Sequence, residues 1–369
     1  MSYTYTFPAL RGTQAGREYF VAMCPLKLLP RIFLFDEASL PPELRAQRTL
    51  NVARVPEIAR YVAENQRDYA FSAITASIDG EVRFEPAEMG DGTSDAGRLV
   101  VPMSARFVIN DGQHRRAAIE KALDECPDLG EETIAVVFYL DNGLRRSQQL
   151  FADLNKHAVR PTKSLGVLYD YRDPLAGLAR DMVQGATLFK GLTELEKTAI
   201  SNRSIKLFTL SAIYQATGAL LGKRKNDPID KDEKELALHF WNKLAHIIPE
   251  WQLVIRREVS SAELRRDYVH THGVVLHALG IAGHALLQSH PDDWPQRLGR
   301  LRQVDWSRSN VTVWEGRAMS GGRINKSRHN VQATAVFLKK TLGLTLTAAE
   351  RQVEARVVSI RQESTSTQE

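Results

Sequence analysis

The sequence has 369 residues, 43% of them hydrophobic, which is enough for a sizeable core and predicts two domains. Lys and Arg number 49 against 44 Asp and Glu, a net charge of +5 that permits a nucleic-acid partner without requiring one. The two cysteines, Cys24 and Cys126, lie far apart and form no CxxC. This usage excludes a disulfide framework and a four-ligand zinc site, and it favours a reducing compartment.

The N-terminus has no basic segment followed by an apolar one, so a secretory signal peptide is not expected. Uncharged apolar stretches also fall short of the length that spans a membrane. We therefore expect a soluble, cytoplasmic protein with no membrane partner.

The first part of the chain mixes strand and helix patterns. Strands are expected at 18–24 and 133–140 from their β-branched and aromatic content, and the segment 69–86 is typical of two strands joined by an Asp-Gly turn. Amphipathic helices are expected at 55–66 and 144–155. The Gly- and Asp-rich stretch 88–98 has no Walker spacing and indicates a surface loop.

From about residue 164 the pattern becomes helical. Segments 201–225, 235–255 and 273–288 are typical of helices, the first ending its apolar run at Gly222. The sequence thus predicts an α+β protein with a mixed N-terminal domain (1–163), a helical basic region (164–361) and a disordered polar tail (362–369).

Residues 297–328 carry eight Lys or Arg residues and two acidic ones, a net charge of +6. Trp306 and Trp314 are interleaved with them, and residues 320–330 are rich in Gly, Ser and Asn. A flexible basic segment with aromatic residues suits contact with a phosphate backbone. The alternative is a solvated loop whose arginines pair with acidic helices. The DNA contacts predicted in this segment are Arg317, Arg323, Lys326 and Arg328.

A second basic cluster, Lys223, Arg224 and Lys225, follows Gly222 at a helix end, where the helix dipole favours cations and where DNA contact is also predicted. The segment 198–218 fits a helix-turn-helix, with its turn at Ser201–Ser204. Arg256, Arg257, Arg265 and Arg266, with Glu258 and Glu263 among them, indicate an ion-paired helical face. Because no carboxylate or cysteine accompanies His270, His272, His277 and His284 at ligand spacing, we expect hydrogen-bonded helix histidines rather than a metal site.

The stretch FVINDGQHRRAAIEKAL (107–123) passes from an apolar strand directly into a helix. Asp111 is expected to cap this helix, and Gly112 would let a ligand approach the backbone. The first amides would then favour an anion, with Arg115 and Arg116 near it and His114 as a donor or proton carrier. Two interpretations stay open: a capped helix with surface arginines, or the edge of a phosphate site.

DGQHRRAA (111–118) resembles the DGQHR signature of a bacterial family related to the ParB N-terminal domain and sulfiredoxin. A second stretch, QLFADLNKHAVRPTKSL (149–165), resembles the block that follows this helix in the family. The segments 201–217 and 322–344 extend the resemblance, which is strongest to the DndB family of DNA sulfur-modification (phosphorothioation) proteins.

The resemblance implies a ParB/sulfiredoxin-like N-terminal fold whose turn binds nucleotide phosphates. It assigns Asp111, Gly112, Gln113, His114 and Arg115 to that turn, with Arg116 beside it and with Asn155 and Ser164 facing the same pocket. The cysteine of sulfiredoxin is missing, since Gln113 stands before His114, and this argues against sulfiredoxin redox chemistry.

The leading hypothesis from the resemblance is a repressor of the phosphorothioation gene cluster, which binds double-stranded DNA and works with other phosphorothioation proteins. The enzymatic alternative is a nucleoside triphosphatase that uses ATP or GTP with Mg²⁺ and drives DNA cleavage or a conformational switch. In it, Arg115 would stabilise phosphate charge while His114 or Asp111 positions water or metal. A third hypothesis is an interaction module whose turn binds nothing, and a homo-oligomer is left open.

Overall fold

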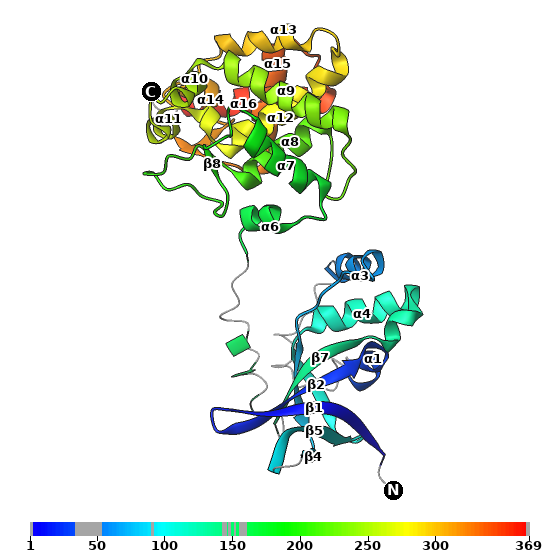
Figure 1. Cartoon of the computed structure of the whole chain (residues 1–369). Helices are drawn as coiled ribbons and strands as arrows, with labels where there is room; N and C mark the ends of the chain where they lie inside the picture. The colour runs from blue at the N-terminus through cyan, green and yellow to red at the C-terminus, as the bar shows by residue number, and fades with distance from the viewer. Residues whose placement is uncertain are drawn as a thin grey trace. The chain divides into compact units, whose positions relative to one another are not determined.

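The chain folds into two compact units, Met1–Val159 and Arg160–Glu369, each described here by itself (Figure 1). The structure is a computed structural model that describes residues 3–33, 54–89, 92–141, 146, 149–150, 153–154 and 161–366. Most of the helix predicted at 144–155 therefore lies outside the described residues. The predicted α+β class, with a mixed N-terminal half and a helical C-terminal half, is confirmed.

The first unit is built on one seven-stranded sheet with the order β4-β5-β1-β2-β7-β3-β6. Every neighbouring pair is antiparallel except β3 and β7, which run parallel. Its strands are β1 (Thr4–Gln14), β2 (Arg17–Pro25), β3 (Ile74–Asp79), β4 (Arg83–Met89), β5 (Gly92–Pro102), β6 (Arg106–Asp111) and β7 (Thr133–Leu140). The strands predicted at 18–24 and 133–140 are confirmed as β2 and β7.

One face of this sheet forms the core of the unit because apolar side chains alternate onto it. In register, Phe20 of β2 lies beside Phe138 of β7, which in turn lies beside Ala76 of β3, and all three are buried. The helices cover this face (Figure 1). They are α1 (Leu29–Ile32), the predicted α3 (Val55–Glu64) and α4 (Gln113–Glu125), with the 3-10 turns η1 (Leu26–Leu28) and η4 (Pro127–Glu131).

Two predictions for the first unit are wrong in detail. The strands on either side of the Asp-Gly turn, β3 and β4, do not pair, because β3 pairs with β6 and β7 while β4 pairs only with β5. Within the predicted surface loop 88–98, residues 88–89 end β4 and residues 92–98 begin β5. Gly97 explains part of this pairing, since a Cβ there would collide with the carbonyl oxygen of Glu85 and only glycine permits so close an approach.

The second unit is helical, with two pairs of two-residue strands, β8 (Thr193–Glu194) with β9 (Phe208–Thr209) and β10 (Met319–Ser320) with β11 (Arg323–Ile324). Its helices are α6 (Lys163–Tyr169), α7 (Pro174–Gly185), α8 (Leu210–Leu221), α9 (Lys231–Ile247), α10 (Pro249–Ile255), α11 (Ser261–Asp267), α12 (Gly273–Ser289), α13 (Trp294–Leu298), α14 (Val311–Trp314), α15 (Arg328–Leu342) and α16 (Ala348–Ser366), with the 3-10 turns η6 (Val269–Thr271) and η7 (Gly299–Gln303). The predicted stop at Gly222 is confirmed, since Gly222 caps α8 with a φ of 68°.

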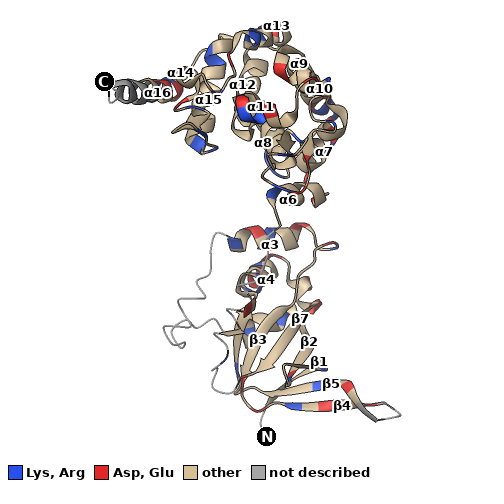
Figure 2. Cartoon of the chain, turned by 90° about the vertical axis from the view of Figure 1, so that its left-hand side faces the viewer, with Lys and Arg blue, Asp and Glu red and all other residues tan. Residues whose placement is uncertain are grey.

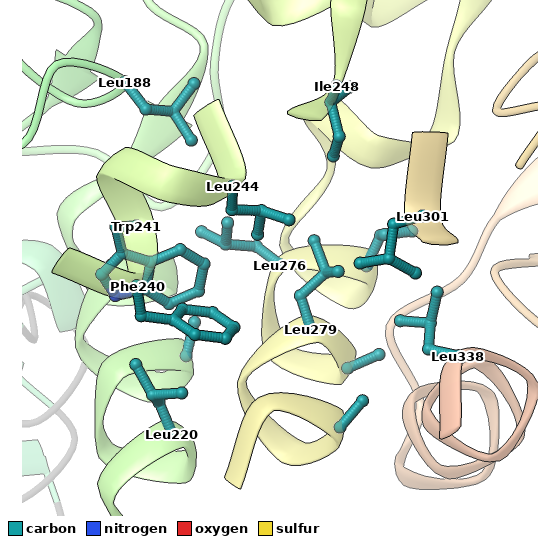
Figure 3. Packing of buried hydrophobic residues seen from close by; sticks show 14 of the residues in the cluster. Leu188, Leu220, Phe240, Trp241, Leu244, Ile248, Leu276, Leu279, Leu301 and Leu338 are labelled. Carbon is teal, nitrogen blue, oxygen red and sulfur yellow. The ribbon is translucent and has the colours of Figure 1, made fainter. Parts of the chain in front are cut away.

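The centre of this unit is α12, which packs against α8 and α15. Two small residues allow the close approach. A Cβ at Gly280 would collide with the carbonyl oxygen of Ala216 in α8, and one at Gly283 would lie 2.5 Å from the Phe240 ring. Figure 3 shows the leucines of α12 between the side chains of α9 and those of the later segments; the labelled residues include Phe240, Trp241, Leu244, Leu276, Leu279, Leu301 and Leu338.

The structure corrects two further predictions in this unit. Residues 199–207 contain no helix before α8, so the helix-turn-helix is absent from this segment. The basic stretch 297–328 is not a flexible segment with exposed aromatic residues: it contains α13, η7, α14 and the β10–β11 pair, and Trp306 and Trp314 are fully buried and stacked on each other. Burial of these two large rings stabilises the segment against the core. Among the described residues, no helix is long and apolar enough to cross a membrane.

Candidate nucleic-acid interface

The DGQHR turn is built differently from the predicted capped helix. Asp111 is the last residue of β6, and the N-cap of α4 is Gly112, with a φ of 110° and no side-chain cap. The prediction that Asp111 caps α4 is therefore wrong. A Cβ at Gly112 would lie 3.0 Å from Cγ1 of Ile74, so both the left-handed backbone and the close packing favour glycine.

Arg115 holds this turn against the residues that precede β3. Its guanidinium donates to the Asp111 carboxylate at 2.6 Å, to the carbonyl oxygens of Ser72 at 2.7 Å and Ala73 at 3.0 Å, and to the Ser72 hydroxyl. The side chain is 15% exposed. The structure thus gives Arg115 four protein acceptors at the position where a phosphate was predicted.

The side chains of Arg116 and Gln113, beside Arg115, also have partners within the protein. Arg116 is buried and pairs with Glu120 at 2.6 Å, and the buried Gln113 donates to the carbonyl oxygen of Ile109 at 3.4 Å. Burial and the positive charge of Arg54 lower the pKa of His114, although the nearby Asp111 carboxylate acts against them. Phosphate binding and catalysis at this turn stay predictions.

The two remaining residues that the resemblance assigns to the pocket are Asn155 and Ser164. Asn155 lies outside the described residues. Ser164 is buried in the second unit, where its hydroxyl donates to the carbonyl oxygen of Lys197 at 2.9 Å and lies 3.2 Å from the hydroxyl of Ser211. These two contacts of Ser164 lie within the helical unit, and its place in the pocket of the turn stays a prediction.

The predicted DNA contact Arg317 is part of the core of the second unit. It is buried, its Nη2 donates to both carboxylate oxygens of Glu354 at 2.9 and 3.0 Å, and its guanidinium lies 4.9 Å from the centre of the Phe337 ring. A cation with these partners stabilises the fold and is not presented to a ligand. Arg323, in contrast, is exposed on β11.

The cluster after Gly222 is partly neutralised. Lys223 pairs with Glu233 at 2.8 Å, and Lys225 pairs with Asp170 at 3.1 Å. The Arg224 side chain is exposed, while its backbone amide donates to Asp227. Two of the three predicted cations thus have carboxylate partners, which weakens their attraction for phosphate.

Six cations line three adjoining pockets in the second unit. A pocket of about 630 Å³ shares Thr198, Thr209 and Lys326 with a second of about 520 Å³, and it shares Arg266 and Arg308 with a third of about 560 Å³. We call this surface the basic cleft, defined by Lys163, Arg265, Arg266, Arg308, Lys326 and Arg328. Figure 2 shows the Lys and Arg residues of α11 and at the start of α6.

Arg265 lines the 630 Å³ pocket and forms hydrogen bonds with the loop before α8. Its guanidinium donates to the carbonyl oxygens of Ser201 at 2.9 Å, Ser204 at 3.1 Å and Lys206. These acceptors, with the carbonyl oxygen of Asn202, are all neutral, and in the described part of the chain no carboxylate lies at ion-pair distance from Arg265. His272 donates from Nε2 to the carbonyl oxygen of Arg265 at 2.9 Å.

The two carboxylates that line the cleft, Glu263 and Asp267, have partners of their own. Glu263 forms a capping box with Ser260 at the start of α11, and Asp267 pairs with Arg266 at 2.8 Å. Within the described ranges, Arg308 and Arg328 have no carboxylate partner at ion-pair distance. Of the predicted ion-paired face over residues 256–266, the described residues show one ion pair, between Arg266 and Asp267, and the cleft retains a positive excess.

Sequence reasoning found part of this site. Lys326 and Arg328 were predicted as DNA contacts, and they do line the 520 Å³ pocket. The sequence did not predict DNA contacts at Lys163, Arg266 and Arg308. These residues come from α6, α11 and the loop before α14, which are distant in sequence. Only the tertiary packing brings these segments together.

Comparison with known proteins agrees with the resemblance drawn from the sequence. No curated protein and no solved structure matches the chain. A family described as DndB, DNA-sulfur modification-associated, matches residues 7–345, which confirms the resemblance to DndB. This match includes the DGQHR turn, α11 and the start of α15, and it covers most of both units. The chain belongs to the DndB family of DNA-sulfur modification-associated proteins.

Proposed function

We propose that the protein is a DNA-binding regulator of a DNA phosphorothioation gene cluster and that it holds the phosphate backbone in the basic cleft. One observation supports this most: six cations line the cleft, and its two carboxylates already bond to Ser260 and Arg266. Membership of a DNA-sulfur modification family supports DNA as the partner, with other modification proteins acting beside it.

The side chains expected to reach DNA are the exposed cations of the cleft and its margin. Arg308 and Arg328 have no carboxylate partner among the described residues, and Lys163 and Arg323 are exposed. Each phosphate neutralised by such a side chain releases condensed counterions, so affinity falls as salt rises. Phosphate contacts fix position without reading sequence, so operator preference requires additional contacts to base edges.

The test is a gel-shift measurement with the promoter of the protein's own gene cluster and with competitor DNA at several salt concentrations. We expect preference for the promoter and a steep salt dependence. Replacing both Arg308 and Arg328 by Ala should reduce the slope of log K against log salt by about 2, since each lost phosphate contact contributes about 0.9.

The control is Lys190→Ala, which removes an exposed cation that lines none of the three pockets. It should leave the slope unchanged. Binding with no preference for the promoter would exclude the regulator. An unchanged slope in the Arg308 and Arg328 double variant would remove the cleft from the interface.

The nucleoside triphosphatase alternative gains no support from the geometry of the turn, because Arg115 already contacts Asp111, Ser72 and Ala73. We therefore do not advance it as a second function. Phosphate release from ATP or GTP that disappears in Arg115→Ala while the variant stays folded would reverse this judgement.

A further inference from the structure

One part of the basic cleft is a pocket lined by two lysines, Lys163 and Lys326. We call it the inner pocket and define it by Lys163, Gln215, Gly273, His277 and Lys326. Lys326 belongs to the walls of both the 630 Å³ and the 520 Å³ pockets, and its Nζ donates to Oε1 of Gln215 at 2.7 Å. The hydrogen bond holds the ammonium group of Lys326 between Gln215 of α8 and Gly273 of α12.

The charges of the inner pocket are all of one sign. No Asp or Glu lines the 520 Å³ pocket among the residues that the structure describes. Burial and the charge of Lys163 lower the pKa of Lys326, and burial and Lys326 together lower that of His277. Cations gathered in this way repel one another, and an anion between them would reverse the sign of the interaction.

The N-terminus of the 17-residue helix α12 opens onto the same place. Its N-cap, His272, makes no capping hydrogen bond, because its ring is turned to the carbonyl oxygen of Arg265. Gly273 follows, and a Cβ there would lie only 3.0 Å from Nζ of Lys326. The missing side chain thus leaves the first turn of α12 open beside a lysine, an arrangement that favours phosphate.

We propose that the inner pocket binds the phosphate group of a small organic phosphate about the size of a mononucleotide, whose other part occupies the adjoining 630 Å³ pocket. That volume falls in the range of about 300–1,000 Å³ typical of small-molecule sites. Its wall is apolar near Ala199, Ile200 and Phe208 and basic near Arg308 and Lys326, which suits a ligand with one apolar and one anionic end. A free nucleotide and the phosphorylated end of a DNA strand present the same chemistry.

The inference goes beyond the proposed function, since such a ligand binds with or without duplex DNA. The experiment is isothermal titration of the full chain with inorganic phosphate, with AMP, and with a short single-stranded oligonucleotide that either carries or lacks a 5′-phosphate. We expect saturable binding of AMP that inorganic phosphate displaces. If the phosphorylated oligonucleotide binds and AMP does not, the DNA end is the source of the phosphate.

Two variants locate the site. Lys326→Gln keeps a polar side chain and removes the charge, and Gly273→Ala adds one methyl group without removing any charge. Each should weaken binding by at least about tenfold, or about 1.4 kcal/mol. Arg115→Ala, which alters the DGQHR turn, should leave the affinity unchanged. Circular dichroism confirms that each variant is folded.

The outcomes separate this inference from the proposed function. Gly273→Ala should retain its affinity for promoter DNA, because the exposed cations of the cleft remain. Absence of binding by all phosphate probes, or equal binding by wild type, Lys326→Gln and Gly273→Ala, would overturn the inner pocket even if the promoter still binds. Loss of binding in Arg115→Ala alone would place the phosphate at the turn instead.

Discussion

Arg317 and Glu354 form a bidentate ion pair inside the second unit, with side chains only 4% and 15% exposed. The pair joins the segment after α14 to α16, and the guanidinium also donates to the carbonyl oxygen of Val313 at 2.8 Å. Burial acts to raise the pKa of Glu354, but its bonds to Arg317 and the charge of Lys340 hold that pKa below its ordinary value. The contact links this segment to a helix through charge rather than through apolar packing.

Arg317→Ala should destabilise the protein by about 3–5 kcal/mol, because it leaves the largely buried Glu354 carboxylate without its main partner. Thermal and urea denaturation measure this change. The matched control is Arg323→Ala at an exposed position of β11, which should stay within about 0.5 kcal/mol of wild type. Weakened DNA binding with unchanged stability in Arg317→Ala would contradict the structural role.

Gly280→Ala should destabilise the second unit by about 1–3 kcal/mol, since the added methyl group meets the backbone of α8 at Ala216. Gly177→Ala is the matched control, because the nearest atom to its Cβ is a guanidinium nitrogen of Arg180 at 3.8 Å. The control should stabilise helix α7 by about 0.5–1 kcal/mol. Equal melting temperatures for the two variants would exclude close packing of α8 against α12.

Arg115→Ala should release the DGQHR turn from the residues before β3. Hydrogen exchange followed by mass spectrometry should show faster exchange in peptides that cover Ser72, Ala73 and Gly112. Arg115→Lys should restore little of the protection, because a single ammonium group does not reproduce the planar fork of the guanidinium. Unchanged exchange in both variants would show that Arg115 does not hold the turn.

His272 should remain neutral through the physiological range. Burial lowers its pKa to about 4 from an ordinary value of 6.5, with Arg308 and His270 adding to the effect. The unfolded chain binds the proton more readily, so this contribution to stability is complete above about pH 6.5 and is lost as the pH falls towards 4. In His272→Gln, melting temperatures between these limits should depend less on pH. An NMR titration of His272 near 6.5 would contradict the prediction.

The sequence predicted elements whose pattern is local. β2, β7, α3 and the glycine stop of α8 follow from β-branched and aromatic content, amphipathicity and capping. The DGQHR signature together with the second stretch indicated the family. Arg317 and Arg323 show the limit, because they lie in the same basic stretch and are indistinguishable by composition. Arg317 is buried against Phe337 and Glu354, which are distant in sequence, while Arg323 is exposed.

The candidate site required the same tertiary information. The basic cleft combines residues of α6, α11, the loop before α14 and the start of α15, so no single window of sequence contains its charge excess. The parallel pairing of β3 with β7 was also beyond local patterns. Three strands, β4, β5 and β6, lie between β3 and its parallel neighbour β7 in the chain. Register over such separations is set by core packing.

The position of β7 has a consequence for synthesis of the protein. Among the described residues of the first unit it is the last strand in the chain, yet it lies in the middle of the sheet between β2 and β3. Until Thr133–Leu140 has left the ribosome, the nascent chain holds two separate pieces, β4-β5-β1-β2 and β3-β6, each with an unpaired edge strand. Such edges favour association between chains, so ribosomes stalled upstream of residue 133 should yield aggregation-prone fragments.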